Sequence, residues 1–426
     1  ASYCACTASM GVGVGQRHEA FPYPARAPGD EARRLIEGSP SHPVEIDHFL
    51  FGGRRDWRKP FRALVAGGGT GDGLVMLAQK LADIGCPAEI TYLDLSAASR
   101  AVAEARVAAR GLTSVSFVTA DLLEAPRLGP FDYIDCCGVL HHLRDPDAGF
   151  AALAKALSPE GGAGIMVYAP HGRTGVYALQ DAFGALLSED APSDKVGLAR
   201  EVVEGLPESA WLRRNPFVND HRDGDAGLYD LLLHSRDRAY EIDALEAALG
   251  RAGLGLAGIV EAARYDPMRY LPGTDAMRAR VARLTATEGR VLAERLVGNI
   301  KTHVIYAVPA ARAGRAQVPG GTLVAPMPGD LVPHLTVSSD KLARAVMREG
   351  AITLTLDGMA HRVSIAPGAR QAKATATMLA AVDGRRSLDA ILRAGAPAGG
   401  DAALWSTAER ALRGFNLLHY SQDARR

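Results

Sequence analysis

The sequence predicts an α/β fold built on a mostly parallel sheet, followed by a small α+β domain. Three observations support this fold class. Apolar segments alternate with helical ones over 61–170, the order that gives a parallel sheet with helices on both faces. A glycine run follows the first of these strands. A stretch rich in Ala, Gly and Pro at 310–330 then separates a further set of helices and short strands, and we interpret this stretch as a linker.

The first strand is expected over 63–66, where small and apolar residues precede Gly67, Gly68, Gly69 and Gly71. A helix is expected at 71–84. A strand, a glycine turn and a helix bring backbone N–H groups close to a bound ligand. Taken alone, however, the glycine run also fits an ordinary tight turn.

Polar residues at the ends of the next strands make the pattern more specific. The strand at 90–93 ends in Asp94, which lies 23 residues after Gly71. This is close to the spacing of about 20 at which an acidic residue meets ribose hydroxyls. Asp121 follows the strand at 115–119, and the strand at 131–137 runs into Gly138. Because the carboxyl ends of parallel strands share one edge, we expect these residues to lie together.

This succession resembles the class I S-adenosylmethionine (SAM) dependent methyltransferases over about 61–170, and more loosely to 308. The resemblance implies a Rossmann-like, mostly parallel seven-stranded sheet with SAM as the cofactor. In that family the glycines border the methionine part of SAM, the acid after the second strand binds the ribose, and the acid after the third meets the adenine. The residues implied to contact the cofactor are Gly67, Gly69, Gly71, Asp94, Leu95, Asp121, Leu122, Cys137 and Gly138.

One position departs from the family pattern. The family usually has Asp or Glu two residues before the first glycine, where it helps to anchor the amino end of SAM. This chain has Val65 there.

Composition excludes several classes of protein. Lys and Arg together number 48, as do Asp and Glu, so no basic excess favours nucleic acid as a partner. No run of about 18 apolar residues predicts a membrane span. The five cysteines are odd in number and not spaced for zinc, which favours a reducing, cytoplasmic location and no metal site.

The boundaries of the predicted regions follow from composition and periodicity. We expect a disordered lead without a signal peptide at 1–30 and a cap at 31–60 that includes a helix at 32–36. The methyltransferase domain is expected at 61–309, with helical insertions at 171–240 and 265–297. The linker at 310–330 and a small domain at 331–426 follow.

The small domain is expected to contain a helix at 339–348, strands at 352–356 and 361–365 joined by Asp357-Gly358, and three further helices. The stretch at 378–388 weakly resembles winged-helix domains related to small peptide-binding chaperones. We interpret the domain as an interaction or dimerisation module, which makes a homodimer one expectation. Because the sheet is complete by Val308, the domain is expected to be separable.

The insertion at 171–240 is predicted to form a lid or a wall of the substrate pocket, because long connections at the active face often do so. The alternative is a helical cap whose polar groups satisfy its own turns. Substrate-binding candidates are Tyr168, Arg173, Tyr177, Asp225 and Tyr240, and catalytic candidates are His141, Tyr229, His234 and Arg238. Of the histidine pair, we interpret His141 as nearer the ligand and His142 as structural.

These observations predict methyl transfer from SAM to a small-molecule acceptor. The acceptor is expected to carry a carboxylate, because arginines are plentiful in the lid, and a sulfur nucleophile, because no base is compelling. One alternative is a protein or peptide substrate bound by the C-terminal domain. Another is a non-catalytic SAM-binding scaffold, suggested by Val65.

Overall fold

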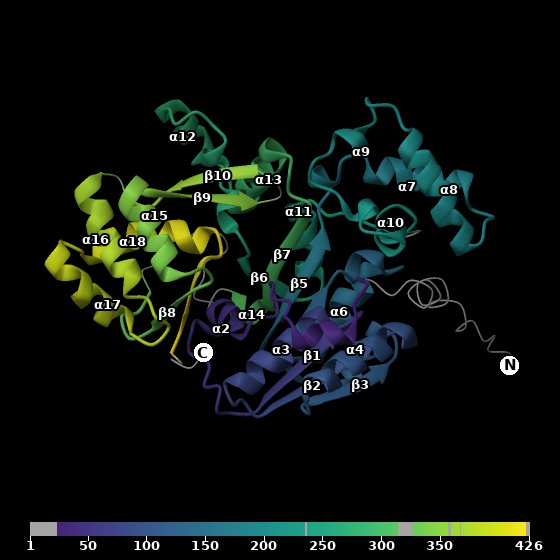
Figure 1. Cartoon of the computed structure of the whole chain (residues 1–426), viewed down its shortest axis with the longest axis horizontal. Helices are drawn as coiled ribbons and strands as arrows, with labels where there is room; N and C mark the ends of the chain where they lie inside the picture. The colour runs from purple at the N-terminus through teal and green to yellow at the C-terminus, as the bar shows by residue number, and fades with distance from the viewer. Residues whose placement is uncertain (1–23, 235–236, 314–326, 357–358, 367, 423–426) are drawn as a thin grey trace.

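The structure is a computed structural model, and it describes residues 24–234, 237–313, 327–356, 359–366 and 368–422 (Figure 1). The expectations for the lead at 1–23, for 314–326 of the linker and for the turn Asp357-Gly358 lie outside the described residues.

Seven strands form the central sheet in the order β3-β2-β1-β4-β5-β7-β6. β1 to β5 pair in parallel, and β7 is antiparallel to both β5 and β6. The predicted fold class is therefore confirmed. The chain reverses its direction of progress across the sheet between β1 and β4, which is where open α/β sheets bind ligands. The bounds are β1 Phe61–Ala66, β2 Ala88–Asp94, β3 Val115–Thr119, β4 Phe131–Cys137, β5 Leu157–Tyr168, β6 Leu254–Ile259 and β7 Thr302–Pro309.

Helices cover both faces of the sheet, and alternate residues of β1 show why. Leu64 and Ala66 pack into one apolar core, whereas Ala63 and Val65 pack into the other, because successive side chains of a strand point to opposite faces. The helices around these cores are α2 Pro43–Phe51, α3 Asp72–Asp83, α4 Ala97–Ala109, α5 Ala125–Leu128, α6 Pro146–Ala156, α11 Ile242–Arg251 and α14 Ala310–Ala313, with the 3-10 turns η2 Leu122–Glu124 and η3 Leu140–His142.

Two local expectations are corrected. The helix expected at 32–36 is instead the 3-10 turn η1, Pro28–Ala32, and the α-helix of this region is α2. α2 begins with Pro43 at its first position, where the missing N–H is harmless, and ends at Gly52 with φ 61°. The pair Gly161-Gly162 also suggests, from the sequence, a break before a fifth strand at 163–169. Both glycines instead lie inside β5, where Gly162 leaves room for Leu50 of α2.

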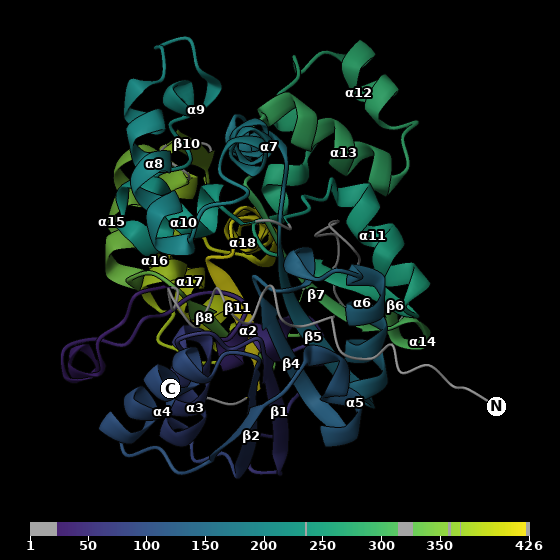
Figure 2. The same ribbon diagram turned by 90° about the vertical axis from the view of Figure 1, so that its right-hand side faces the viewer.

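The lid over 171–240 has an apolar core of its own. In Figure 2 its helices stand above the sheet, beside the second insertion. The lid contains η4 His171–Arg173, α7 Val176–Leu186, α8 Pro192–Gly205, α9 Trp211–Arg214, η5 Asp220–Arg222 and α10 Asp225–Leu232. The second insertion contains η6 Ala262–Tyr265, η7 Pro267–Arg269, α12 Asp275–Val281 and α13 Ala286–Val297. None of the described helices is long and apolar enough to cross a membrane.

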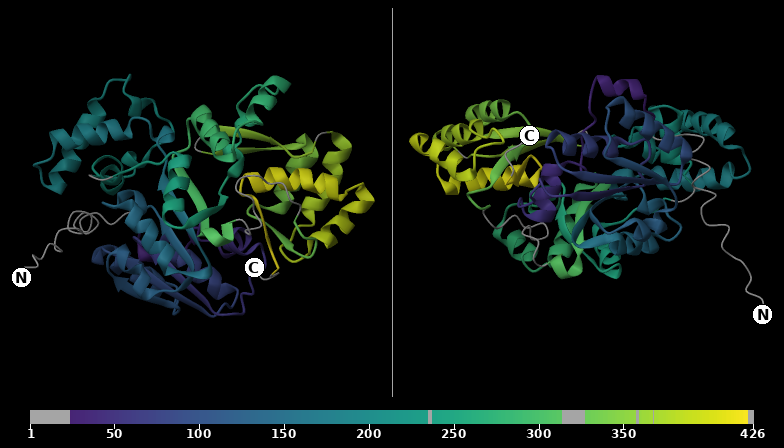
Figure 3. Two further views of the ribbon diagram at one scale, coloured as in Figure 1. Left: turned by 180° about the vertical axis from the view of Figure 1, so that it is seen from behind. Right: turned by 90° about the horizontal axis from the view of Figure 1, so that it is seen from below.

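The C-terminal unit, 327–422, has a separate apolar core and lies on the opposite side of the sheet from the lid (Figures 1 and 3). Sequence reasoning missed two of its strands, β8 and β11, which pair antiparallel. The winged-helix likeness stays a prediction. The elements are β8 Val332–Leu335, α15 Ser339–Glu349, β9 Ala351–Leu356, β10 Met359–Ser364, α16 Ala369–Ala380, α17 Leu388–Gly395, η8 Ala396–Ala398, α18 Ala402–Gly414 and β11 Leu418–Ser421.

Helix α2 joins the C-terminal unit to the sheet through buried polar groups. Glu45 accepts hydrogen bonds from Tyr306 of β7 (2.7 Å) and from Asn416 (2.8 Å). Asp47 accepts one from the Ser421 hydroxyl (2.6 Å). Removing the unit would take one hydrogen-bond donor from each of these buried acids, which is costly, so we expect a chain that ends in the linker to be less stable.

Candidate active site

A cavity of about 980 Å³ lies at the carboxyl ends of β1 to β5. It is lined by every residue that the sequence implied for the cofactor, including Gly67, Asp94, Asp121 and Cys137. These residues come from four strand ends that are far apart in the chain, and the sheet topology alone brings them together. Their role in binding stays a prediction, but their convergence on one cavity is a structural fact.

The glycine turn at this cavity requires glycine. Gly67 has φ 69° and Gly71 has φ 96°, a left-handed region that other residues rarely adopt. A Cβ on Gly67 would also collide with Val139. Asp94 fixes the turn by accepting hydrogen bonds from the backbone N–H of Gly69 (2.8 Å) and of Ser96 (2.8 Å).

A buried carboxylate that sequence reasoning missed lies beside this turn. Asp135 of β4 is the register partner of Val65, is 2% exposed and lines the cavity. The Ser41 hydroxyl donates a short hydrogen bond to it, and burial raises its pKa to about 6. No described Lys, Arg or His forms an ion pair with Asp135. The absence of an acid at Val65 was the signal that could have directed attention to the neighbouring strand.

The segment 24–41, here called the N-terminal strap, crosses the cavity, and Pro24, Ile36 and Ser41 line it. Buried ion pairs hold the strap: Arg106 of α4 bonds Glu31 (2.6 Å) and Asp72 of α3 (2.7 Å). The strap is therefore the part of the region before β1 that covers the cavity. Phe49 and Trp57, which also precede β1, pack in the core.

The other end of the cavity is polar and lies under the lid. Tyr168, at the end of β5, lines it together with His142, Asp230 and Arg238. The Tyr168 hydroxyl donates to Asp230 Oδ2 (3.3 Å). The Arg173 guanidinium carbon lies 3.6 Å from the centre of the Tyr168 ring, an arrangement that favours cation–π attraction.

The structure reverses the expected roles of the histidine pair. His142 lines the cavity, whereas His141 does not and is only 1% exposed. The His141 ring packs on Tyr168 with centroids 3.9 Å apart, and burial holds its pKa well below the usual value. His142 stacks on His234 with centroids also 3.9 Å apart. His234 therefore supports His142 from the lid.

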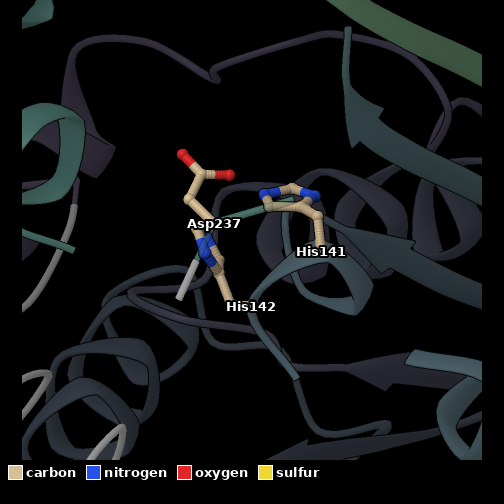
Figure 4. Close-up of side chains that lie close together, drawn as sticks. All are labelled: His141, His142 and Asp237. Carbon is tan, nitrogen blue, oxygen red and sulfur yellow. The ribbon is translucent and has the colours of Figure 1, made fainter. Parts of the chain in front are cut away.

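Donor atoms of His141, His142 and Asp237 lie within 4.8 Å of one another (Figure 4). Two imidazoles and a carboxylate are residue types that bind transition metals. Asp237, however, already accepts hydrogen bonds from Arg173 (3.1 Å) and Gln180 (3.1 Å), so a positive charge is present in the cluster. The expectation of no metal stays a prediction.

Five other candidates lie away from the cavity. Asp225 is on the lid surface, where it pairs with Arg200 (2.6 Å). Tyr229 packs in the lid core, and Tyr240 packs in the core of the sheet. Tyr177 accepts a hydrogen bond from Arg173 Nε (3.0 Å), so both residues position Tyr168 instead of lining the cavity. Periodicity did not reveal which polar groups of the lid face inward.

Comparisons with known proteins agree with this geometry. Residues 64–163 match the model of a methyltransferase domain family. An uncharacterized protein of Synechococcus sp. is 35% identical over 232 residues, which are 53% of this chain and 54% of that protein. The chain thus matches about half the length of this curated relative.

Two solved structures of PKMT2 from Rickettsia typhi, one in complex with AdoHcy, share the fold at TM-score 0.59. They are 15% and 14% identical and cover 90% of this chain, and the likeness spans 76% and 75% of theirs. The shared fold therefore extends beyond the residues that match the methyltransferase model.

Proposed function

We propose that the chain, whose residues 64–163 match a methyltransferase domain, is a class I, SAM-dependent enzyme that transfers the methyl group of SAM to a small-molecule acceptor bound beneath the lid. The observation that carries this proposal is the single cavity, because it joins the glycine turn and strand-end acids to the polar end under the lid. Cofactor and acceptor can therefore lie side by side in one cavity, and an in-line displacement requires this proximity.

The cavity residues fit the charges of SAM. Bound SAM supplies a methyl group that is already activated by its positive sulfur. In our proposal Asp94 accepts hydrogen bonds from the ribose hydroxyls of SAM, and the glycine turn lets the methionine part of SAM lie close to the backbone. Asp135 would receive the α-ammonium group, because a buried carboxylate without a cationic partner is stabilised by a bound cation. Asp135 also removes the reason for proposing a non-catalytic scaffold, which rested on Val65.

A small acceptor is favoured over a peptide bound by the C-terminal unit. All the residues that line the cavity fall within 24–238, and the C-terminal unit lies on the other side of the sheet (Figure 3). Arg238 lines the acceptor end, and an arginine there suits a carboxylate-bearing acceptor. The proposed sulfur nucleophile rested on the lack of a candidate base, and Asp230 and His142 at the cavity wall weaken that reason.

Calorimetry with S-adenosylhomocysteine tests the cofactor part of the proposal. Asp94→Ala is expected to weaken binding about ten- to a hundredfold, since a charged acceptor of hydrogen bonds contributes about 1.5–3 kcal/mol. Asp135→Asn should weaken the binding of S-adenosylhomocysteine. It should leave the binding of 5′-methylthioadenosine, which has no ammonium group, unchanged. If the unmutated chain binds neither ligand, the proposed function is wrong.

A further inference from the structure

Asp230 is a carboxylate that faces the acceptor end of the cavity and is oriented by its neighbours. It lies in α10, the last helix of the lid, and lines the cavity with Tyr168 and His142. The Tyr168 hydroxyl donates to its Oδ2 atom at 3.3 Å. Because Tyr168 ends the central strand β5, the lid carboxylate is tied to the rigid sheet.

Tyr168 is itself held on both sides. The Arg173 guanidinium lies over its ring at 3.6 Å, and the His141 ring packs on it at 3.9 Å. Arg173 is in turn fixed by Asp237 (3.1 Å) and Tyr177 (3.0 Å). This chain of contacts leaves Asp230 little freedom, which is the arrangement expected of a preorganised polar site.

The charge of Asp230 is only partly offset, by the neighbouring cation Arg173. No described Lys, Arg or His forms an ion pair with it, and Arg173, the nearby cation, is already paired with Asp237. Burial raises the pKa of Asp230 to about 6, so the group is mostly ionised at neutral pH. A half-buried anion that faces a ligand cavity, as Asp230 does, is stabilised by a cation with N–H donors.

An amine meets this requirement better than a thiol or an alcohol. Amines enter as ammonium ions, which supply both the charge and the hydrogen bonds. They must also lose a proton before they can attack, so they need a base within reach. A thioether needs neither a counter-charge nor a base.

We propose that the acceptor's nucleophile is an amine and that Asp230 binds its ammonium form and accepts its proton; this rests on the proposed function. The ammonium N–H bond breaks as the proton moves to the Asp230 carboxylate. The amine lone pair then forms the new N–C bond, while the S–C bond of SAM breaks and its electron pair stays on sulfur. The proton leaves Asp230 for solvent. The amine belongs to the small-molecule acceptor of the proposed function, and methylation of a lysine side chain instead would favour the alternative of a peptide acceptor.

Matched probes separate the nucleophiles. With the protein saturated with S-adenosylhomocysteine, binding of 6-aminohexanoate and 6-hydroxyhexanoate is compared by thermal shift and calorimetry. With SAM, methylation of these two acids, 6-mercaptohexanoate and a lysine-containing peptide is followed by mass spectrometry. We expect 6-aminohexanoate to bind about tenfold tighter than its hydroxyl analogue, and the amine to be the methylated group. The peptide shows whether lysine can supply it.

Asp230→Asn keeps the shape and an oxygen for the Tyr168 hydroxyl but removes the charge. It should abolish the preference for the amine and slow amine methylation about a hundredfold, the range of general-base catalysis. S-adenosylhomocysteine should still bind within twofold, which shows that the protein is folded. Asp225→Asn is the control, since Asp225 lies on the same helix but is exposed and paired with Arg200.

Two binding results would overturn the amine assignment: an unmutated protein that binds S-adenosylhomocysteine but shows no preference for the amine, or a preference that survives Asp230→Asn. Faster methylation of the thiol would also overturn it. Each of these leaves the methyltransferase proposal standing. Failure to bind S-adenosylhomocysteine, by contrast, would remove the proposed function itself.

Discussion

At the scale of single residues, the cofactor end of the cavity depends on glycines that no side chain can replace. Gly67 combines φ 69° with a position where a Cβ would meet Val139. Gly85, after α3, has nearly the same backbone angle, φ 68°, but open space around it. Comparing alanine substitutions at Gly67 and Gly85 therefore separates the effect of backbone strain from that of a collision with Val139.

We expect Gly85→Ala to lower stability by about 1 kcal/mol, the usual penalty for a left-handed L-residue, without changing ligand affinity. Gly67→Ala should lower stability further and weaken S-adenosylhomocysteine binding at least tenfold, because the turn must shift into the cavity. Melting temperatures and calorimetry measure both effects. Equal behaviour of the two variants would show that Val139 yields easily and that the turn does not need glycine for fit.

The candidate residues also show which site positions could be predicted from the sequence and which could not. Asp94 and Asp121 were predictable because they follow strands at a familiar spacing. Asp135 was not, because its importance comes from pairing with Val65 across two strands that lie far apart in the sequence. His141 and His142 are neighbours in the chain, and only the packing of the Tyr168 ring on His141 decides which one reaches the cavity.

At the scale of elements, the N-terminal strap is held by ion pairs to α3 and α4 and not by apolar packing alone. Arg106 is 1% exposed and contacts Glu31 and Asp72. Removing one partner of a buried ion network leaves charges without compensation, which costs about 3–5 kcal/mol. Arg100, on the same helix, pairs with Glu104 near the surface, where such pairs contribute about 0.3–0.5 kcal/mol.

Arg106→Met should therefore lower the free energy of unfolding by several kcal/mol and speed release of S-adenosylhomocysteine, since the strap covers the cavity. Arg100→Met should do neither. Denaturant unfolding and stopped-flow release measure the two quantities. An Arg106→Met protein with unchanged release would mean that the strap does not control access to the cavity.

Elements with strong local signals were the ones that the sequence predicted well. The first four strands of the sheet and the helix at 339–348 carry clear apolar patterns, and the structure has them within a few residues. β8 and β11 were missed because each is short, β8 contains Pro333, and their pairing joins segments about eighty residues apart. Pairing at that distance leaves no turn signal between the strands.

At the scale of the whole molecule, helix α2 is one of the contacts between the sheet and the C-terminal unit. Asp47 is completely buried there and accepts hydrogen bonds from the Ser421 hydroxyl and from the Arg55 N–H (2.9 Å). Burial raises the pKa of Asp47 to about 7, compared with about 3.9 in an unfolded chain. Docking of the C-terminal unit is therefore linked to protonation of one carboxyl group.

The sign of this linkage follows from the two pKa values. Between about pH 4 and 7 the folded state holds a proton on Asp47 that the unfolded state has released. The contribution of Asp47 to stability is full below pH 4 and is lost as the pH rises through 7, at up to about 1.4 kcal/mol per pH unit. Asp47→Asn cannot titrate, and its amide can still accept from Arg55 N–H and donate to Ser421.

We therefore expect the stability of the unmutated protein, relative to Asp47→Asn, to fall steadily from pH 4 to 7 and then to level off. Urea unfolding of both proteins across this range measures the difference. Other groups with shifted pKa values, such as Asp135 and His419, titrate in both proteins, so their effects cancel in the difference.

Asp330→Asn serves as the control, because Asp330 joins the same two units through an exposed pair with Arg54, and its pKa is lowered instead of raised. Its difference from the unmutated protein should stay constant above pH 5. A difference for Asp47→Asn that is also flat over pH 4 to 7 would show that Asp47 is ionised in the folded protein and that docking does not depend on its proton.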